Sequence, residues 1–99
     1  MSAETKTDME LLARLIVAID DSSLAEHFIA DFLSQSEITD IAERWRILEK
    51  IDQGLSQRQV RDELNVSLAK VSRCAQILKS DRQSYLKLKH KMNFPHKQA

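Results

Sequence analysis

Residues 56–79 have the types and spacing of a nucleic-acid-binding motif. Ser56 and Gln59 have the spacing of a capping box, in which each side chain bonds to the backbone N–H of the other residue at the start of a helix. At residues 65–67, asparagine tolerates the left-handed conformation of a tight turn, and Ser67 can cap the helix that follows. The sequence therefore predicts two short helices joined by a tight turn.

The second of these helices is predicted to have one apolar and one polar side. Its apolar residues recur at the spacing of a single helical face. The residues between them are small, polar or basic: Ala69, Lys70, Ser72, Arg73 and Gln76. A compact helix pair with such a surface fits the major groove of DNA. Residues 56–79 are therefore interpreted as a helix-turn-helix; the alternative is an ordinary helical hairpin with solvated basic residues.

The charges of the chain are divided between its two halves. There are 15 Lys and Arg against 15 Asp and Glu, so the formal net charge is zero. Residues 1–53 hold 5 basic and 12 acidic residues, a net charge of −7, whereas residues 54–99 hold 10 basic and 3 acidic residues, a net charge of +7. The sign changes where the predicted helix-turn-helix begins. A phosphate backbone is therefore attracted to the second half and repelled by the first.

Length and composition point to one all-α domain. One glycine, one proline and few aromatic residues argue against strands with tight turns, and 3.6-residue periodicity runs through most of the 99 residues. The single cysteine, Cys74, excludes an intramolecular disulfide and fits a reducing compartment. No apolar run approaches the roughly 20 residues of a membrane span. We therefore expect a cytoplasmic protein that has no membrane partner.

No pattern of residues indicates an enzyme. The three histidines lie far apart in the sequence, and no spacing of cysteine, histidine and carboxylate residues is typical of a metal site or a nucleophile. We therefore expect no catalytic residue, no metal and no cofactor other than a small-molecule effector.

Capping signals and apolar periodicity predict about six short helices in a single domain, residues 1–99. Besides Ser56, capping boxes are predicted at Ser23, Ser34 and Ser80, and Gly54 is expected to end a helix with a positive φ. The expected parts are N-terminal dimerisation helices (residues 9–55), the helix-turn-helix (56–79), a last helix (80–90) and a disordered basic tail (91–99).

Helices this short cannot all bury their apolar faces within one chain of 99 residues. The first two predicted helices have wide apolar faces and little else to cover them. We therefore expect an obligate homodimer in which these helices pack against the partner chain. A two-fold dimer would present two recognition helices to successive major grooves, and a monomeric bundle is the alternative.

Several sequence elements, taken in order, carry a family resemblance. They are Phe32-Leu33-Ser34, the run Arg44-Trp45-Arg46-Ile47-Leu48-Glu49, Gly54, Ser56-Gln57-Arg58, Glu63-Leu64, and Ser72-Arg73 through Leu78-Lys79. Together they resemble the bacterial Trp repressor family over residues 9–90, most closely within 32–79. The resemblance implies an intertwined all-α homodimer of six helices per subunit, with the fourth and fifth forming the helix-turn-helix. It also implies a repressor of a palindromic operator in double-stranded DNA, bound when L-tryptophan occupies a pocket beside that motif.

The resemblance assigns DNA contacts to both helices of the motif. The matching positions are Gln57, Arg58, Arg61, Leu68, Ala69, Ser72 and Lys79. Polar and basic residues at the rim suit phosphates or a base edge, whereas Leu68 and Ala69 suit thymine methyl groups. Lys70 is expected to be exposed at the same end of the motif and to add a DNA contact that the family lacks.

The resemblance also implies an amino-acid site, which transfers in part. In the family the indole ring of L-tryptophan lies between two arginines, which match Arg44 and Arg73. Backbone carbonyls near Leu33 and Ser34 match those that bind the amino group of the ligand. Three further positions depart from the family: Lys70 stands in place of a threonine, Cys74 in place of a glycine and Ile77 in place of a serine.

These departures bear on whether a ligand binds. Cys74 and Ile77 add bulk to a pocket for a flat ring, and overpacking typically costs about 1–3 kcal/mol. Lys70 is expected either to pair with the carboxylate of the ligand or to occupy the pocket itself. The resemblance implies gating by L-tryptophan or another aromatic amino acid, and the three departures predict that L-tryptophan itself binds weakly or not at all. A ligand-independent DNA-binding protein and a helical dimer that acts as a protein-interaction module are the alternatives.

Overall fold

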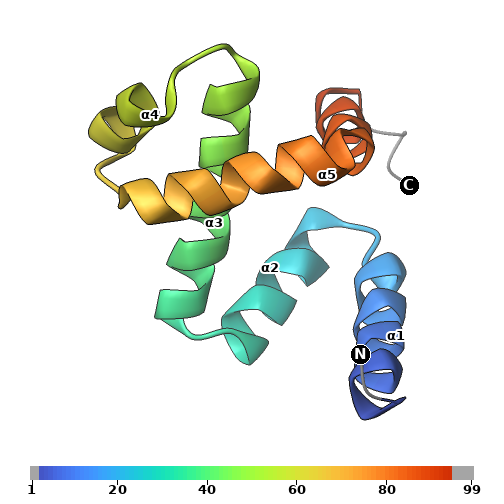
Figure 1. Cartoon of the computed structure of the whole chain (residues 1–99). Coiled ribbons are helices and arrows are strands. Elements are labelled where there is room, and N and C mark those ends of the chain that lie inside the picture. The colour runs from blue at the N-terminus through green and yellow to red at the C-terminus, as the bar shows by residue number, and fades with distance from the viewer. Residues whose placement is uncertain (1–2, 95–99) are drawn as a thin grey trace. The chain divides into compact units, whose positions relative to one another are not determined.

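The computed structural model describes residues 3–94, and all regular structure in this part of the chain is helical (Figure 1). The helices are α1 (Ala3–Ala18), α2 (Ser22–Phe32), α3 (Gln35–Asp52), α4 (Gln57–Leu64) and α5 (Leu68–Asn93). The predicted all-α fold class is confirmed. The chain divides after Leu33 into two compact units: an N-terminal unit with α1 and α2, and a C-terminal unit with α3, α4 and α5.

A break inside α5 explains why five helices are observed where about six were predicted. Asp81 has φ −152° and ψ 62°, so two helical segments meet at this residue. Its carboxylate accepts a hydrogen bond from the backbone N–H of Ser84 at 3.2 Å and so caps the second segment. The hydroxyl of Ser80, which was predicted to be this cap, donates instead to the carbonyl of Ile77 at 3.3 Å.

The two ends of the helical region also differ from the prediction. α1 begins at Ala3, with Glu4 in its first turn, because polar residues with adequate helix propensity extend the helix before its apolar part. α5 continues to Asn93, beyond the predicted end at residue 90, and has Lys91 in its last turn, where a cation favours the helix dipole. The start of the expected basic tail is thus helical, and residues 95–99 lie outside the described residues.

Serine capping boxes start α3 and α4, as predicted. Ser34 accepts a hydrogen bond from the N–H of Glu37 at 3.1 Å, and the Glu37 carboxylate accepts one from the N–H of Ser34 at 2.8 Å. Ser56 and Gln59 form the same reciprocal pair at 3.1 and 2.8 Å. Each box satisfies two backbone donors that a helix start otherwise leaves without an intrahelical partner.

The cap of α2 differs from the prediction. Asp21, rather than Ser23, is the N-cap, and its carboxylate accepts a hydrogen bond from the N–H of Leu24 at 2.7 Å. The physical reason is that a carboxylate both accepts this bond and places a negative charge at the positive end of the helix dipole. A serine two residues later offers only the first of these.

The turn between α4 and α5 has the geometry that the sequence predicts. Asn65 has φ 55° and ψ 50°, and is the one non-glycine residue with positive φ in the described chain. The N–H groups of Asn65 and Val66 both donate to the carbonyl of Arg61, and Ser67 then caps α5. Gly54, which follows the C-cap of α3, has φ 101°, as the sequence predicts.

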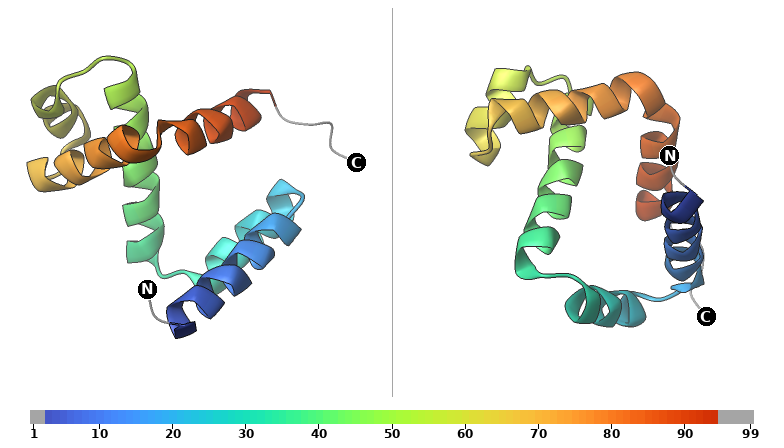
Figure 2. Two further views of the ribbon diagram at one scale, coloured as in Figure 1. Left: turned by 45° about the vertical axis from the view of Figure 1, so that its right-hand side comes forward. Right: turned by 60° about the horizontal axis from the view of Figure 1, so that its bottom comes forward.

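One hydrophobic cluster holds the C-terminal unit together. Its buried members are Ile47, Leu48, Val60, Val71, Cys74, Leu78 and Tyr85. α3, α4 and α5 each contribute one fully buried residue to it. Figures 1 and 2 show α5 crossing α3, with α4 beside the first turns of α5. The ring of Trp45 packs against that of Tyr85 at 5.1 Å between centroids, and its indole nitrogen is the one buried side-chain polar atom in residues 3–94 without a hydrogen bond.

The segment of α5 after Asp81 is tied to the end of α3 by one carboxylate. Asp52 accepts a hydrogen bond from Arg82 at 2.7 Å and lies 3.4 Å from the hydroxyl of Tyr85 and 3.5 Å from the ammonium of Lys89. Because the break interrupts the backbone hydrogen bonds of the helix, these side-chain contacts and the burial of Tyr85 hold the second segment in place.

α1 and α2, taken as a unit, bury no residue within the chain. Val17 is 82% exposed and Phe32 is 70% exposed, although the rings of Phe28 and Phe32 stack on each other at 4.8 Å. Many large apolar side chains exposed on two successive helices are characteristic of an interface. The N-terminal unit therefore has apolar faces without cover in the isolated chain.

Replacement of Asn65 tests the turn of the helix-turn-helix. We expect Asn65→Ala to lower the free energy of unfolding by about 1 kcal/mol, because an alanine pays the left-handed penalty without local hydrogen bonding, whereas Asn65→Gly should be close to neutral. Urea unfolding followed by circular dichroism measures both. Equal losses in the two variants would contradict a left-handed residue at this position.

Candidate nucleic-acid interface and the adjoining cavity

Most residues predicted to contact DNA are exposed on α4 and α5. Two stand at the start of α4, three lie in the first two turns of α5, and one is farther along α5: Gln57, Arg58, Leu68, Ala69, Ser72 and Lys79. Within residues 3–94, neither Arg58 nor Lys79 forms an ion pair with a carboxylate. Both cations are therefore free to meet phosphate groups.

Arg61 is less available than these residues. It is half-buried on α4, and its guanidinium donates a hydrogen bond to the neighbouring carboxylate of Asp62 at 2.8 Å. This interaction raises the pKa of Arg61 and lowers that of Asp62. A phosphate at this position has to compete with Asp62 for the guanidinium.

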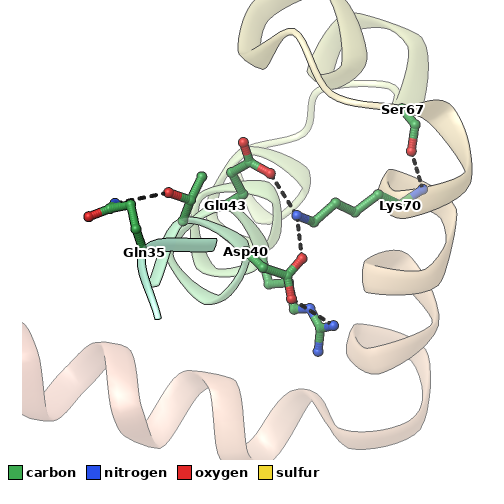
Figure 3. A network of polar contacts seen from close by, with 7 residues as sticks. Gln35, Asp40, Glu43, Ser67 and Lys70 are labelled. Carbon is green, nitrogen blue, oxygen red and sulfur yellow. Dashed lines mark hydrogen bonds and ion pairs between the residues drawn. The ribbon is translucent and has the colours of Figure 1, made fainter. Parts of the chain in front are cut away.

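The expectation that Lys70 is exposed on the DNA-facing side is wrong. Its ammonium lies 2.6 Å from Asp40 and 2.6 Å from Glu43, both on α3, and its side chain is only 17% exposed (Figure 3). Its own backbone N–H donates to the hydroxyl of Ser67, the N-cap of α5, at 3.1 Å. Lys70 therefore links the first turn of α5 to α3, with its side chain directed toward α3.

Asp40 and Lys70 keep their charges over the neutral range. Hydrogen bonds from Lys70 lower the pKa of Asp40, and those to Asp40 and Glu43 raise the pKa of Lys70. A carboxyl group whose pKa is lowered by folding stabilises the fold at pH values above its pKa in the unfolded chain. This stabilisation is lost as the pH falls through the pKa in the folded protein. A lysine whose pKa is raised by folding stabilises the fold at pH values below its pKa in the unfolded chain. This stabilisation is lost as the pH rises through the pKa in the folded protein. The pair of Asp40 and Lys70 thus stays ionised at neutral pH.

A cavity of about 310 Å³ adjoins the ion pairs of Lys70. This volume is near the lower end of the range of ligand pockets. Its lining comes from α3 and α5: Asp40, Arg44, Lys70, Arg73, Cys74 and Ile77. The two arginines that the family resemblance assigned to an indole ring thus line one cavity. Arg44 pairs with Asp40 at 2.9 Å, whereas the guanidinium of Arg73 forms no ion pair within residues 3–94.

The other predicted ligand residues fall into two groups. Cys74 is 2% exposed and Ile77 is 42% exposed, so both side chains occupy space at the cavity wall. Burial raises the pKa of the Cys74 thiol, which is therefore a neutral, inert hydrophobe. Leu33 is the C-cap of α2 in the N-terminal unit, and Ser34 caps α3; neither is among the residues that line the cavity. Their contact with an amino group stays a prediction.

Asp40 and Glu43 are site residues that the sequence analysis did not single out. Their spacing of three places both on one face of α3, which was the available signal. That signal is weak, because exposed helices carry many such pairs. Only the crossing of α5 over α3 places both carboxylates within reach of Lys70.

The fold and the site can be compared with known proteins. None of the helices in residues 3–94 combines the length and apolarity that a membrane span requires. No curated protein and no solved structure matches the chain. The family model described as Trp repressor protein matches residues 7–93, which include the whole C-terminal unit as far as α5 extends. The chain therefore belongs to the Trp repressor family, a family of DNA-binding transcription regulators.

Proposed function

We propose that the protein is a transcriptional repressor that binds a palindromic operator in double-stranded DNA as a homodimer. The observation that carries the proposal is the exposed row of residues on α4 and α5, presented by a capped helix-turn-helix in a member of the Trp repressor family. The start of α5 offers small and apolar side chains for base edges. Free cations at its rim offer phosphate contacts.

The charge distribution supports the same orientation on DNA. Residues 54–99 carry a net charge of +7, whereas residues 1–53 carry −7. Phosphate contacts dominate the affinity of such interfaces and make it dependent on salt, while base contacts determine sequence preference. A molecule charged in this way approaches DNA with the α4–α5 side.

The homodimer is supported by the apolar surface that the isolated chain leaves uncovered. Exposed large apolar residues on α1 and α2 include Val17, Leu24 and Phe32. A second copy of the chain is the partner that buries the same faces on both subunits. In a two-fold dimer the two recognition helices meet half-sites about one helical turn of DNA apart, roughly 34 Å.

We further propose that L-tryptophan binds weakly or not at all. Lys70 lines the cavity with its ammonium already paired to Asp40 and Glu43, and Cys74 and Ile77 form part of the cavity wall. Arg44 and Arg73 keep the two guanidinium groups that could stack on an aromatic ring. The protein is then a ligand-independent DNA-binding regulator or responds to a smaller effector.

Selection from a pool of random-sequence duplexes tests the proposal as a whole. Enrichment of one palindromic sequence would support an operator-binding dimer. Weak binding that ignores sequence and falls steeply with salt would favour a protein-interaction module, since nonspecific DNA binding is electrostatic.

Arg58 and Lys79 are predicted to contact phosphates. We expect Arg58→Ala and Lys79→Ala each to weaken binding across DNA sequences and to reduce the slope of log K against log salt by about one unit, because each lost contact releases fewer counterions. Fluorescence anisotropy at several salt concentrations measures both quantities. An unchanged slope in both variants would remove these residues from the interface.

The assembly is tested by deletion of residues 1–33. We expect the remaining chain to aggregate or unfold, because the dimer interface proposed for α1 and α2 is lost. Light scattering and circular dichroism report the outcome, with the full chain, expected to be a dimer, as the control. A monodisperse helical monomer from residues 34–99 would contradict the intertwined dimer.

The cavity is tested by a variant that restores the residues of the family. We expect Lys70→Thr, Cys74→Gly and Ile77→Ser together to create or strengthen L-tryptophan binding, since they remove bulk and free the carboxylate end. The ligand-free variant should be less stable, with about 1 kcal/mol lost through glycine in a helix. Titration calorimetry compares it with the unmodified protein, for which micromolar binding would show that the cavity tolerates its own side chains.

A further inference from the structure

We propose that Lys70 is a positioning residue for DNA binding: its ammonium, held by Asp40 and Glu43, fixes the first turns of α5 on α3 without any diffusible ligand. The inference rests on the proposed function and adds the means by which the recognition surface is formed. It assigns Lys70 a role opposite to the one expected of an exposed lysine in this motif, because the residue supports the interface from behind.

The geometry makes Lys70 a two-ended anchor (Figure 3). At the backbone end, its N–H donates to the hydroxyl of Ser67, which fixes the start of α5. At the side-chain end, two carboxylates of α3 receive the ammonium at 2.6 Å each. One residue thus connects the turn, the first turn of the recognition helix and the helix behind it.

The surroundings strengthen this contact relative to other ion pairs of the protein. Of the cations that form ion pairs within residues 3–94, Lys70 is the least exposed, at 17% against 30% for Lys50 and for Lys89. Shielded, charge-assisted hydrogen bonds are stronger than exposed pairs, which contribute little. The pairing also satisfies an ammonium that would otherwise be unpartnered and partly desolvated.

The contact has a direct consequence for the interface. Ala69 and Ser72 lie on the same turns of α5 as Lys70, and their side chains are exposed where that of Lys70 is not. A base contact depends on the position of these turns to a fraction of an ångström. Loss of the contact between Lys70 and the two carboxylates of α3 therefore lowers DNA affinity, even though Lys70 itself contacts no phosphate.

A set of matched variants separates this role from a simple charge effect. Lys70→Met removes the ammonium and keeps the stem, the double change Asp40→Asn and Glu43→Gln removes the two acceptor charges, and Lys70→Arg keeps a cation. Lys87→Met is the control, since Lys87 is exposed and forms no ion pair within the described residues. The probe is the duplex that the unmodified protein selects from a random-sequence pool, used without added amino acid.

The sign of the effect in the carboxylate variant is decisive. We expect Lys70→Met and the Asp40/Glu43 double variant both to weaken binding, each by roughly 5- to 30-fold. Lys70→Arg should retain most of the affinity, and Lys87→Met should change it less than Lys70→Met. By charge alone, loss of two carboxylates would strengthen binding to phosphates, so stronger binding by the double variant would overturn the proposal.

Salt dependence provides a second criterion. Lys70→Met should weaken binding with an unchanged slope of log K against log salt, whereas a lysine that contacts phosphate would lower the slope by about one unit. A lowered slope would make Lys70 a DNA contact and overturn the positioning role. Binding by the unmodified protein only after addition of L-tryptophan would equally overturn it.

Hydrogen exchange without DNA distinguishes a failure of this inference from a failure of the proposed function. Amides of residues 68–74 should exchange faster in Lys70→Met and in the double variant than in the unmodified protein. Unchanged exchange would overturn the claim that Lys70 fixes the first turns of α5. If the unmodified protein selects no duplex, the proposed function fails and the DNA role of Lys70 with it. If the unmodified protein binds DNA but both variants bind equally well, only the role of Lys70 fails.

Discussion

Ile47 on α3, Val60 on α4 and Val71 on α5 are fully buried in one cluster, and the rest of the C-terminal unit depends on this contact. Three helices that share a core of only seven buried residues have little hydrophobic stabilisation to spare. The polar contacts at the helix ends therefore carry unusual weight. Serine caps start each of the three helices, and Asp52 holds the far segment of α5.

The acidic and basic halves of the sequence have separate roles within this unit. α3 is acidic on the side that faces α5, where Asp40 and Glu43 receive Lys70. Other cations on α4 and α5, such as Arg58 and Lys79, find no carboxylate within the described residues and stay available. Internal pairing thus uses two cations of the helix-turn-helix, Arg61 with its neighbour Asp62 and Lys70 with α3, and leaves Arg58 and Lys79 available for phosphate.

Local features of the fold were predictable from sequence, and features that depend on helix crossing were not. The capping boxes at Ser34 and Ser56 and the left-handed turn at Asn65 follow from residues within one turn of each other. The direction of the Lys70 side chain depends on which face of α3 lies under α5, and no local signal encodes that. Asp21 replaced the predicted cap of α2 for a local reason, since two candidates two residues apart, Asp21 and Ser23, competed for the same helix start.

The pairing of Lys70 with α3 also bears on what the protein can sense. A group that is part of the chain acts at a fixed effective concentration, set by the length of its own side chain and not by the composition of the cell. Such a side chain cannot be depleted or diluted. In the role proposed for Lys70, the group that positions the recognition helix does not follow the level of any metabolite.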